Sequence, residues 1–206
     1  EMCIRDRIVG SADATINSIT VGKGANSVSG NTVLGESALD AAVTGGLNTA
    51  IGNTALTANT SGYQNTVVGA LAMDANTTGS LNTGVGLSAL GSNTSGGHNT
   101  AVGHNSLSIN STGNYNVAVG RRALSANTTA SNNTAVGFDS LLSNTTGTQN
   151  VAVGALALDA NTTADNNTAV GYQSLSENTT GTSNVALGLN ALSSNTVGND
   201  NTAVGR

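Results

Sequence analysis

The sequence repeats every 17 residues, and this period constrains the fold more than any other feature. A block that begins with Asn and carries Gly at its fifth position recurs without insertion or deletion, giving ten full repeats and a truncated eleventh that ends at Arg206. Each unit of such an array contacts only its neighbours, so we expect one repeat domain over residues 31–206. The first Asn of each block, position one, is Asn31, Asn48, Asn65, Asn82, Asn99, Asn116, Asn133, Asn150, Asn167, Asn184 and Asn201.

The positions of the repeat divide into fixed and variable ones. Position four is Val, Leu or Ile, position five is always Gly, position eight is Ala or Ser, and position nine is Leu except at Met73. Position twelve is Asn in nine of the ten full repeats. Variation concentrates at positions six, seven, ten, sixteen and seventeen, which we therefore interpret as solvent-facing.

A second period of 34 residues overlies the first, because residues 116–149 and 150–183 resemble two copies of one two-repeat block. A period of about 34 residues is also typical of helical tetratricopeptide repeats. Here Gly, Asn and Thr interrupt the chain every few residues, at a cost of roughly 0.5–1 kcal/mol each in a helix. The composition therefore argues against a helical solenoid.

Short segments such as TAVG and ALSANTT, separated by Gly and Asn turns, predict strands. We expect an all-β fold, a parallel β-solenoid or β-roll whose coils stack about 4.8 Å apart, so that ten coils span roughly 48 Å. The position-one Asn side chains would stack into a structural ladder between coils. As core residues we expect Val119, Leu124, Val136, Leu141, Val153 and Leu158.

A single coil has little apolar surface to bury. Two sizeable apolar side chains per coil contribute less than the ordering of its backbone costs, and hydrogen bonds of the ladder close only part of that gap. The small residues at positions three and eight would offer a smooth face to neighbouring chains, and we therefore expect a homo-oligomer, a trimer of parallel chains. These residues include Ala118, Ala123, Ala135, Ser140, Ala152 and Ala157.

The residues before the array fall into three segments. Residues 2–7, MCIRDR, back-translate to a sequence that resembles the transposon end used to tag DNA for sequencing, so we interpret residues 1–7 as an adapter artefact. Residues 8–16 are a lead-in, and residues 17–30 form a 14-residue unit. On this interpretation the natural N-terminus is missing, and the stop within a repeat at Arg206 indicates that the natural C-terminus is missing too.

Charge and cysteine content argue against several classes of function. The net charge is −5 and the only adjacent basic pair is Arg121–Arg122, which argues against nucleic acid as a partner. No apolar run is long enough to span a membrane, so we expect no membrane contact in this segment. Cys3 is the only cysteine, which excludes a disulfide within one chain.

Chemically reactive side chains are sparse and scattered. No Ser/His/Asp set or carboxylate pair stands out, so we expect no enzyme, no catalytic residue and no cofactor. His98 and His104 occupy variable positions, where surface exposure is expected rather than metal binding. Asp40, Asp74 and Asp159 share position ten, but a calcium-binding roll needs acids in nearly every coil.

Position twelve also fits the N-glycosylation sequon, Asn-x-Ser/Thr. A buried Asn ladder at this position would explain the same pattern and would leave no amide free to carry a sugar. Glycosylation stays the alternative, conditional on a eukaryotic secretory route. The residues concerned are Asn59, Asn76, Asn93, Asn110, Asn127, Asn144, Asn161 and Asn178.

Two segments resemble known repeat families. Residues 17–30, NSITVGKGANSVSG, are similar to the 14-residue head repeat of trimeric autotransporter adhesins, and AVGRRAL and AVGYQSL fit its half-repeat. The 17-residue form NTAVGxxALxxNTTGxx resembles repeat regions of tail-fibre-like proteins of bacteria and phages. The resemblance implies a trimeric, parallel, left-handed β-roll that serves as the shaft or head of a surface fibre.

The expected function is therefore that of a structural segment of an extracellular, cell-surface or virion fibre that supports adhesion or host attachment. Its expected partners are copies of itself and a host-surface glycan or protein. The alternative is an ice-binding β-solenoid, in which a row such as Thr49, Thr66, Thr83 and Thr100 orders water. Outward, regular Thr side chains would favour ice binding, whereas Thr packed into a turn or a trimer seam would exclude it.

Overall fold

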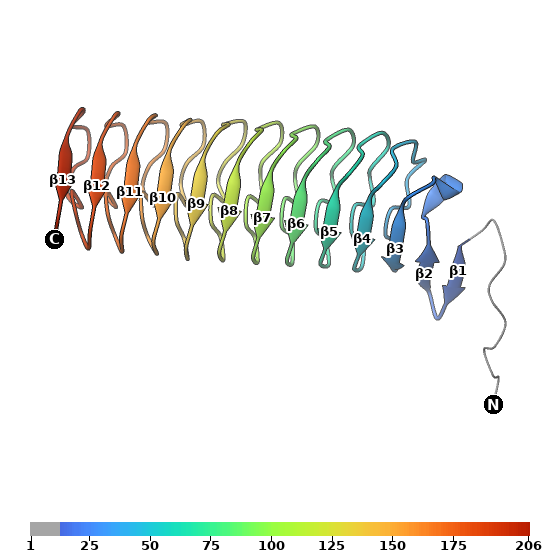
Figure 1. Ribbon diagram of the computed structural model, residues 1–206. Helices are drawn as coiled ribbons and strands as arrows, with labels where there is room; N and C mark the ends of the chain where they lie inside the picture. Colours follow the sequence, from blue (N-terminus) through green and yellow to red (C-terminus); the bar gives the residue numbers. More distant parts are fainter. Residues whose placement is uncertain (1–12) are drawn as a thin grey trace.

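The computed structural model describes residues 13–206, of which residues 31–206 form a parallel β-solenoid of 17-residue coils, and this confirms the expected fold class (Figure 1). Thirteen short strands make one sheet in chain order. The strands are β1 Ala14–Ile16, β2 Ile19–Gly22, β3 Thr32–Gly35, β4 Thr49–Ile51, β5 Thr66–Val68, β6 Thr83–Val85, β7 Thr100–Val102, β8 Val117–Val119, β9 Thr134–Val136, β10 Val151–Val153, β11 Thr168–Val170, β12 Val185–Leu187 and β13 Thr202–Val204. One 3-10 turn, η1, covers Ala25–Ser27.

Strands β3 to β13 pair in parallel, and each residue lies beside the residue 17 positions later. Val119 of β8 faces Val136 of β9, which in turn faces Val153 of β10. Since no repeat gains or loses a residue, this register holds along the rod in Figure 1. Each coil contributes one strand, from positions two to four in β4–β13 and to position five in β3, and the remainder of the coil returns the chain to the sheet.

The second segment predicted as a strand, ALSANTT at residues 123–129, is a run of turns instead. Positions seven and nine both adopt the left-handed backbone conformation, with φ 54° at Arg122 and 54° at Leu124. A strand needs φ near −120° at every residue, so two left-handed residues on either side of Ala123 curl the chain back towards the sheet. The prediction was wrong because apolar composition alone does not report the sign of φ.

A left-handed Leu costs roughly 1–2 kcal/mol, and three interactions offset that cost in each coil. The side chain of Leu141 is fully buried. Its backbone N–H donates to the carbonyl oxygen of Ala157 in the next coil at 3.0 Å, and its own carbonyl accepts from the Asn144 N–H at 3.3 Å. The turn region is therefore joined to its neighbours by hydrogen bonds even though it contains no strand.

Glycine at position five is required by both conformation and space. Gly137 has φ 138°, a value that L-residues rarely adopt. A Cβ atom placed on Gly137 would lie 2.5 Å from the carbonyl oxygen of Gly154 in the next coil. Successive coils therefore approach too closely at this corner for any side chain.

The interior of the solenoid is one continuous apolar core from Val33 to Ala191. Side chains of positions three, eight and nine fill it, and Leu124, Leu141 and Leu158 are fully buried as expected. The small residues at positions three and eight also point inward, since Ala118 and all the other residues named for the seam are buried. They therefore cannot form the expected seam between chains.

Val119, Val136 and Val153 were expected in the core, but they lie on the outside of the strands. Val153 is 37% exposed, and Val119 and Val136 are half-buried. Side chains alternate between the two faces of a strand. Because the Ala of position three points inward, positions two and four must point outward.

Residues 17–30 differ from the expected 14-residue coil. Strand β2 pairs antiparallel with β1 and antiparallel with β3, whereas a further coil would pair in parallel. Strand β2 therefore forms a hairpin with β1 of the lead-in and pairs with the first coil (Figure 1). The proposed adapter, residues 1–7, and residues 8–12 of the lead-in lie outside the described residues.

Candidate interaction surfaces

A row of asparagines at position one lines the corner where each coil enters its strand. The Asn133 Oδ1 accepts a hydrogen bond from the backbone N–H of Asn150 in the next coil at 2.9 Å. The Asn133 Nδ2 donates to the carbonyl oxygen of Gly147 in its own coil at 2.8 Å. The row is buried from Asn31 to Asn184. These amides satisfy backbone groups that the turns leave without a partner.

A second row of asparagines, at position twelve, lies beside the first. The Asn144 Nδ2 donates to the carbonyl oxygen of Gly147 at 2.9 Å and to the Oδ1 of Asn127 at 3.2 Å. Amides from both rows therefore donate to one carbonyl oxygen, that of position fifteen. All eight sequon asparagines from Asn59 to Asn178 are 0% exposed, so in the folded chain these amides are structural and inaccessible to a glycan.

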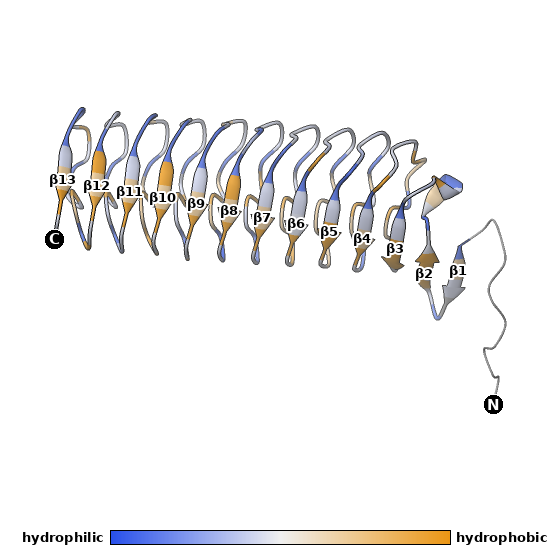
Figure 2. Cartoon of the chain, viewed as in Figure 1, coloured by the Kyte–Doolittle hydropathy of each residue, from blue (hydrophilic) through white to orange (hydrophobic). Residues whose placement is uncertain are grey.

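The outer strand face, formed by positions two and four of β3–β13, runs the length of the array. Position four is apolar in every coil, and its side chains are half-buried or exposed, the exposed ones ranging from 36% at Val102 to 76% at Val204. Position two adds Val117, Val151 and Val185 in alternate coils. Figure 2 shows this alternation as hydrophobic strands β8, β10 and β12 between more polar neighbours.

Hydroxyl side chains form two rows that are partly or fully exposed. On the outer strand face, Thr49, Thr83 and Thr100 are half-buried and Thr66 is exposed, so this row points outward as the ice-binding alternative requires. On another side of the coil, position fourteen is Ser or Thr and exposed in each coil from Ser61 to Thr180, a row that sequence reasoning did not single out. The sequence feature that could have indicated this row is the Ser or Thr that follows the Asn-Thr or Asn-Ser pair of positions twelve and thirteen.

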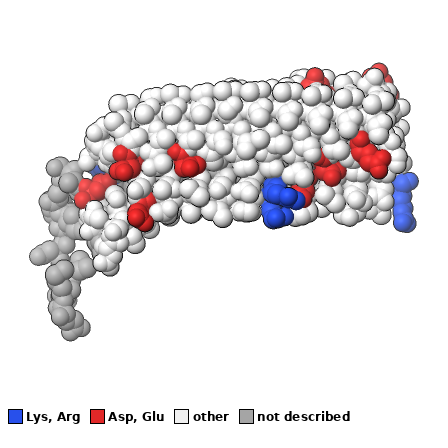
Figure 3. Space-filling view, turned by 180° about the vertical axis from the view of Figure 1, so that it is seen from behind, with Lys and Arg blue, Asp and Glu red and all other residues white. Residues whose placement is uncertain are grey.

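The position-six row contains the most varied exposed side chains. Phe138 is 45% exposed, and the guanidinium carbons of Arg121 and Arg122 lie over its ring, 5.5 and 5.9 Å from the centroid. Arg122 forms an ion pair with the buried carboxylate of Asp139, with Nε 2.8 Å from Oδ1, and this contact raises the pKa of Arg122. Figure 3 shows a basic cluster with acidic side chains beside it, on an otherwise largely uncharged rod.

The histidines lie apart, on two different rows. His98 is exposed at position seventeen and stacks on Tyr115 of the next coil, with ring centroids 4.8 Å apart. His104 is exposed at position six. Within residues 13–206, no three His, Cys, Asp or Glu side chains are grouped so that they could hold a metal ion.

Two position-ten carboxylates are partly withdrawn from solvent. Burial raises the pKa of Asp74, and burial together with the charge of Asp139 raises the pKa of Asp159. The Asp159 Oδ1 is buried and has no hydrogen-bond partner among residues 13–206. An uncompensated carboxylate oxygen of this kind destabilises the charged form.

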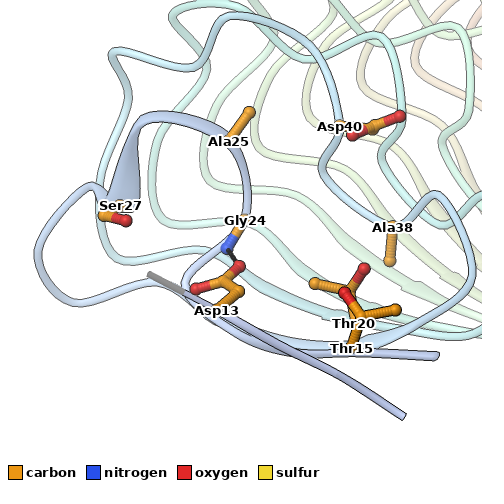
Figure 4. Close-up of a pocket in the computed structure, with 8 residues that line it drawn as sticks. All are labelled: Asp13, Thr15, Thr20, Gly24, Ala25, Ser27, Ala38 and Asp40. Carbon is orange, nitrogen blue, oxygen red and sulfur yellow. Dashed lines mark hydrogen bonds between the residues drawn. The ribbon is translucent and has the colours of Figure 1, made fainter. Parts of the chain in front are cut away.

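A shallow pocket lies where the N-terminal hairpin meets the first coil (Figure 4). Its lining includes Thr15, Thr20 and Asp40, together with Asp13, whose carboxylate accepts hydrogen bonds from the backbone N–H groups of Lys23 and Gly24. The Asp13 side chain therefore holds the loop that follows β2. This role is structural.

No helix within residues 13–206 has the length and apolar character needed to cross a membrane. Comparison with known proteins finds no match to the chain among protein-family models, curated proteins or solved structures.

Proposed function

We propose that the chain is a structural shaft or head segment of an extracellular, cell-surface or virion fibre, in which three parallel copies associate along their outer strand faces. The observation that carries this proposal is the unbroken apolar row at position four, from Leu34 to Val204. A row of Val, Ile and Leu that stays partly or fully exposed along a whole rod is unfavourable in water and marks an association surface.

The period of the row favours a second copy of this chain as the occupant. The apolar side chains recur once per coil, about every 4.8 Å. A surface with a different spacing would drift out of register over ten coils, whereas a parallel copy presents the same row at the same interval. Three copies and a left-handed coil are what the resemblance to adhesin head repeats implies.

Function in this proposal is mechanical and needs no catalysis or cofactor. Ten coils make a rod of roughly 48 Å, in which every coil is hydrogen-bonded to the next through strand, turn and Asn side chains. Such a rod holds a binding site away from the surface to which the fibre is attached. Adhesion or host attachment then depends on exposed side chains of the variable positions.

The test is the native mass of the full chain, measured by light scattering after size-exclusion chromatography. A mass of three chains supports the proposal, and a stable folded monomer overturns it. The double variant Val136→Thr, Val153→Thr makes the position-four row more polar without altering the interior, and we expect a lower fraction of trimer. The matched control Thr146→Val changes an exposed residue of position fourteen and should leave the mass unchanged.

Ice binding is the second candidate, and the outward Thr row of position two favours it. This row is continuous from Thr32 to Thr100 and then alternates with Val. The two candidates use the same face, so assembly of a trimer would remove the ice-binding surface. For a monomer, we expect Thr83→Tyr to abolish thermal hysteresis, with Thr146→Tyr as the control on position fourteen; a monomer without hysteresis excludes this candidate.

A further inference from the structure

Aromatic rings occupy position six in three alternate coils. His104, Phe138 and Tyr172 are 34 residues apart, and Arg121 and Ala155 occupy the same position in the coils between them. Two coils span about 9.6 Å, which is close to the length of two sugar rings in an extended glycan. All three rings are exposed, with Phe138 at 45% and Tyr172 at 48%.

The two gaps between these rings differ in what fills them. In the gap between His104 and Phe138, the chain places Arg121, whose guanidinium lies over the Phe138 ring. In the gap between Phe138 and Tyr172 the residue is Ala155, which has no side chain beyond Cβ. The gap between Phe138 and Tyr172 is therefore bounded by two aromatic side chains and has a small residue at its base. It lacks the guanidinium that occupies the gap between His104 and Phe138.

Charge at this row favours an anionic ligand. Arg121 and Arg122 are the only adjacent basic residues of a chain with net charge −5. The Asp139 carboxylate neutralises Arg122 and fixes its position, whereas Arg121 has no acidic partner within residues 13–206. A free guanidinium beside an aromatic ring recognises a carboxylate or sulfate together with the apolar face of a sugar.

We propose that the position-six row binds an acidic polysaccharide lying along the rod, with one sugar ring over Ala155 between Phe138 and Tyr172 and an acidic substituent paired with Arg121. The site deepens the proposed fibre function, because it names the class of receptor that such a fibre would attach to. It differs from the outer strand face, and its binding is measured independently of trimer formation.

The experiment titrates the full chain with three oligosaccharide probes of equal length and measures heat of binding. The probes are an oligogalacturonate, a sulfated oligosaccharide and a neutral oligogalactose. We expect an acidic probe to bind at least tenfold more tightly than the neutral one, and the two acidic probes distinguish carboxylate from sulfate. Arg121→Ala and Tyr172→Ala should each weaken binding roughly fivefold or more, whereas Tyr115→Ala, on another row, should have no effect.

The decisive variant is Ala155→Arg, which copies into the open gap the residue that fills the first gap. Arg is accommodated at the equivalent position 121, so the fold should be retained, and a circular-dichroism spectrum checks this. If a sugar occupies the gap, Ala155→Arg weakens binding despite its added positive charge. If attraction is only electrostatic, the variant strengthens binding, and the proposal is overturned.

Absence of binding to all three probes would also overturn the site. The native mass, recorded on the same samples, keeps the two proposals separate. If the chain is a trimer but binds no acidic probe, the polysaccharide site is overturned and the proposed fibre still stands. If the chain is a monomer that binds an acidic probe, the proposed trimer is overturned and the polysaccharide site still stands.

Discussion

The strand side and the turn side of each coil reach the same regular stacking by different means. On the strand side, positions two to four use ordinary extended backbone, and Gly at position five allows coils to approach closely. On the turn side, left-handed residues such as Leu141 curl the chain, and Asn144 satisfies the carbonyl that the turn leaves exposed to the interior. One side relies on backbone geometry, and the other on particular side chains.

This difference predicts that the strand side tolerates no added atoms at its corner, whereas the turn side fails when side chains are removed. The comparison is therefore tested by substitutions that add a methyl group at the glycine corner of the strand side and by substitutions that shorten side chains on the turn side.

Gly137→Ala should have the largest effect, a loss of about 3 kcal/mol or more, because it combines an unfavourable φ with overlap of the next coil. Chemical denaturation monitored by circular dichroism measures the loss. Gly205→Ala is the control, since a Cβ there meets nothing within 4 Å. Equal losses at the two sites would show that close approach of the coils is not the cause.

Leu141→Ala should cost about 2–4 kcal/mol, because it opens a cavity in the core on the turn side. The adjacent Leu142→Ala is a matched control, since Leu142 is half-buried at position ten while Leu141 is 0% exposed. Denaturation midpoints of the two variants give the comparison. Similar midpoints would contradict the inward orientation of position nine.

Asn133→Ala and Asn144→Ala separate the two asparagine rows that meet at the Gly147 carbonyl. Asn133→Ala should cost about 2–3 kcal/mol, because it also leaves the buried backbone N–H of Asn150 without a partner. Asn144→Ala should cost about 1–2 kcal/mol. Exposed Asn53→Ala should lie within about 0.5 kcal/mol of the parent, and a reversed order of the two buried variants would refute the assignment.

Asp159→Asn should have the smallest effect, a gain in stability at pH 7 of less than about 1 kcal/mol, since the side chain is partly solvated. Folding raises the pKa of this carboxyl above 3.8, mainly through burial. The ionised form therefore destabilises the fold above the folded pKa, and this penalty disappears as the pH falls below 3.8. Thermal midpoints at pH 7 and pH 3 test this, and a gain that persists at pH 3 would exclude the carboxylate as its cause.

The period and the fixed Gly and Asn residues were sufficient to predict the parallel solenoid and the stacked asparagines. They were not sufficient to place Val136 and Ala135 on the correct faces, because a three-residue strand is too short for its alternation to show which face is buried. Left-handed φ at Leu141 was also beyond prediction, since Leu has no preference for that conformation and adopts it only within the stacked array. The spacing of Phe138 and Tyr172 follows from the 34-residue block, but the position of Arg121 over the Phe138 ring could be found only in the structure.

The constant register also has a genetic consequence. Because every coil contacts its neighbours through the same 17-residue offset, removal or duplication of one whole repeat leaves all other contacts unchanged. Recombination between near-identical DNA repeats would therefore lengthen or shorten the rod in steps of about 4.8 Å, or about 9.6 Å when a two-repeat block is copied. The length of the rod can thus change by mutation while the fold of each coil stays the same.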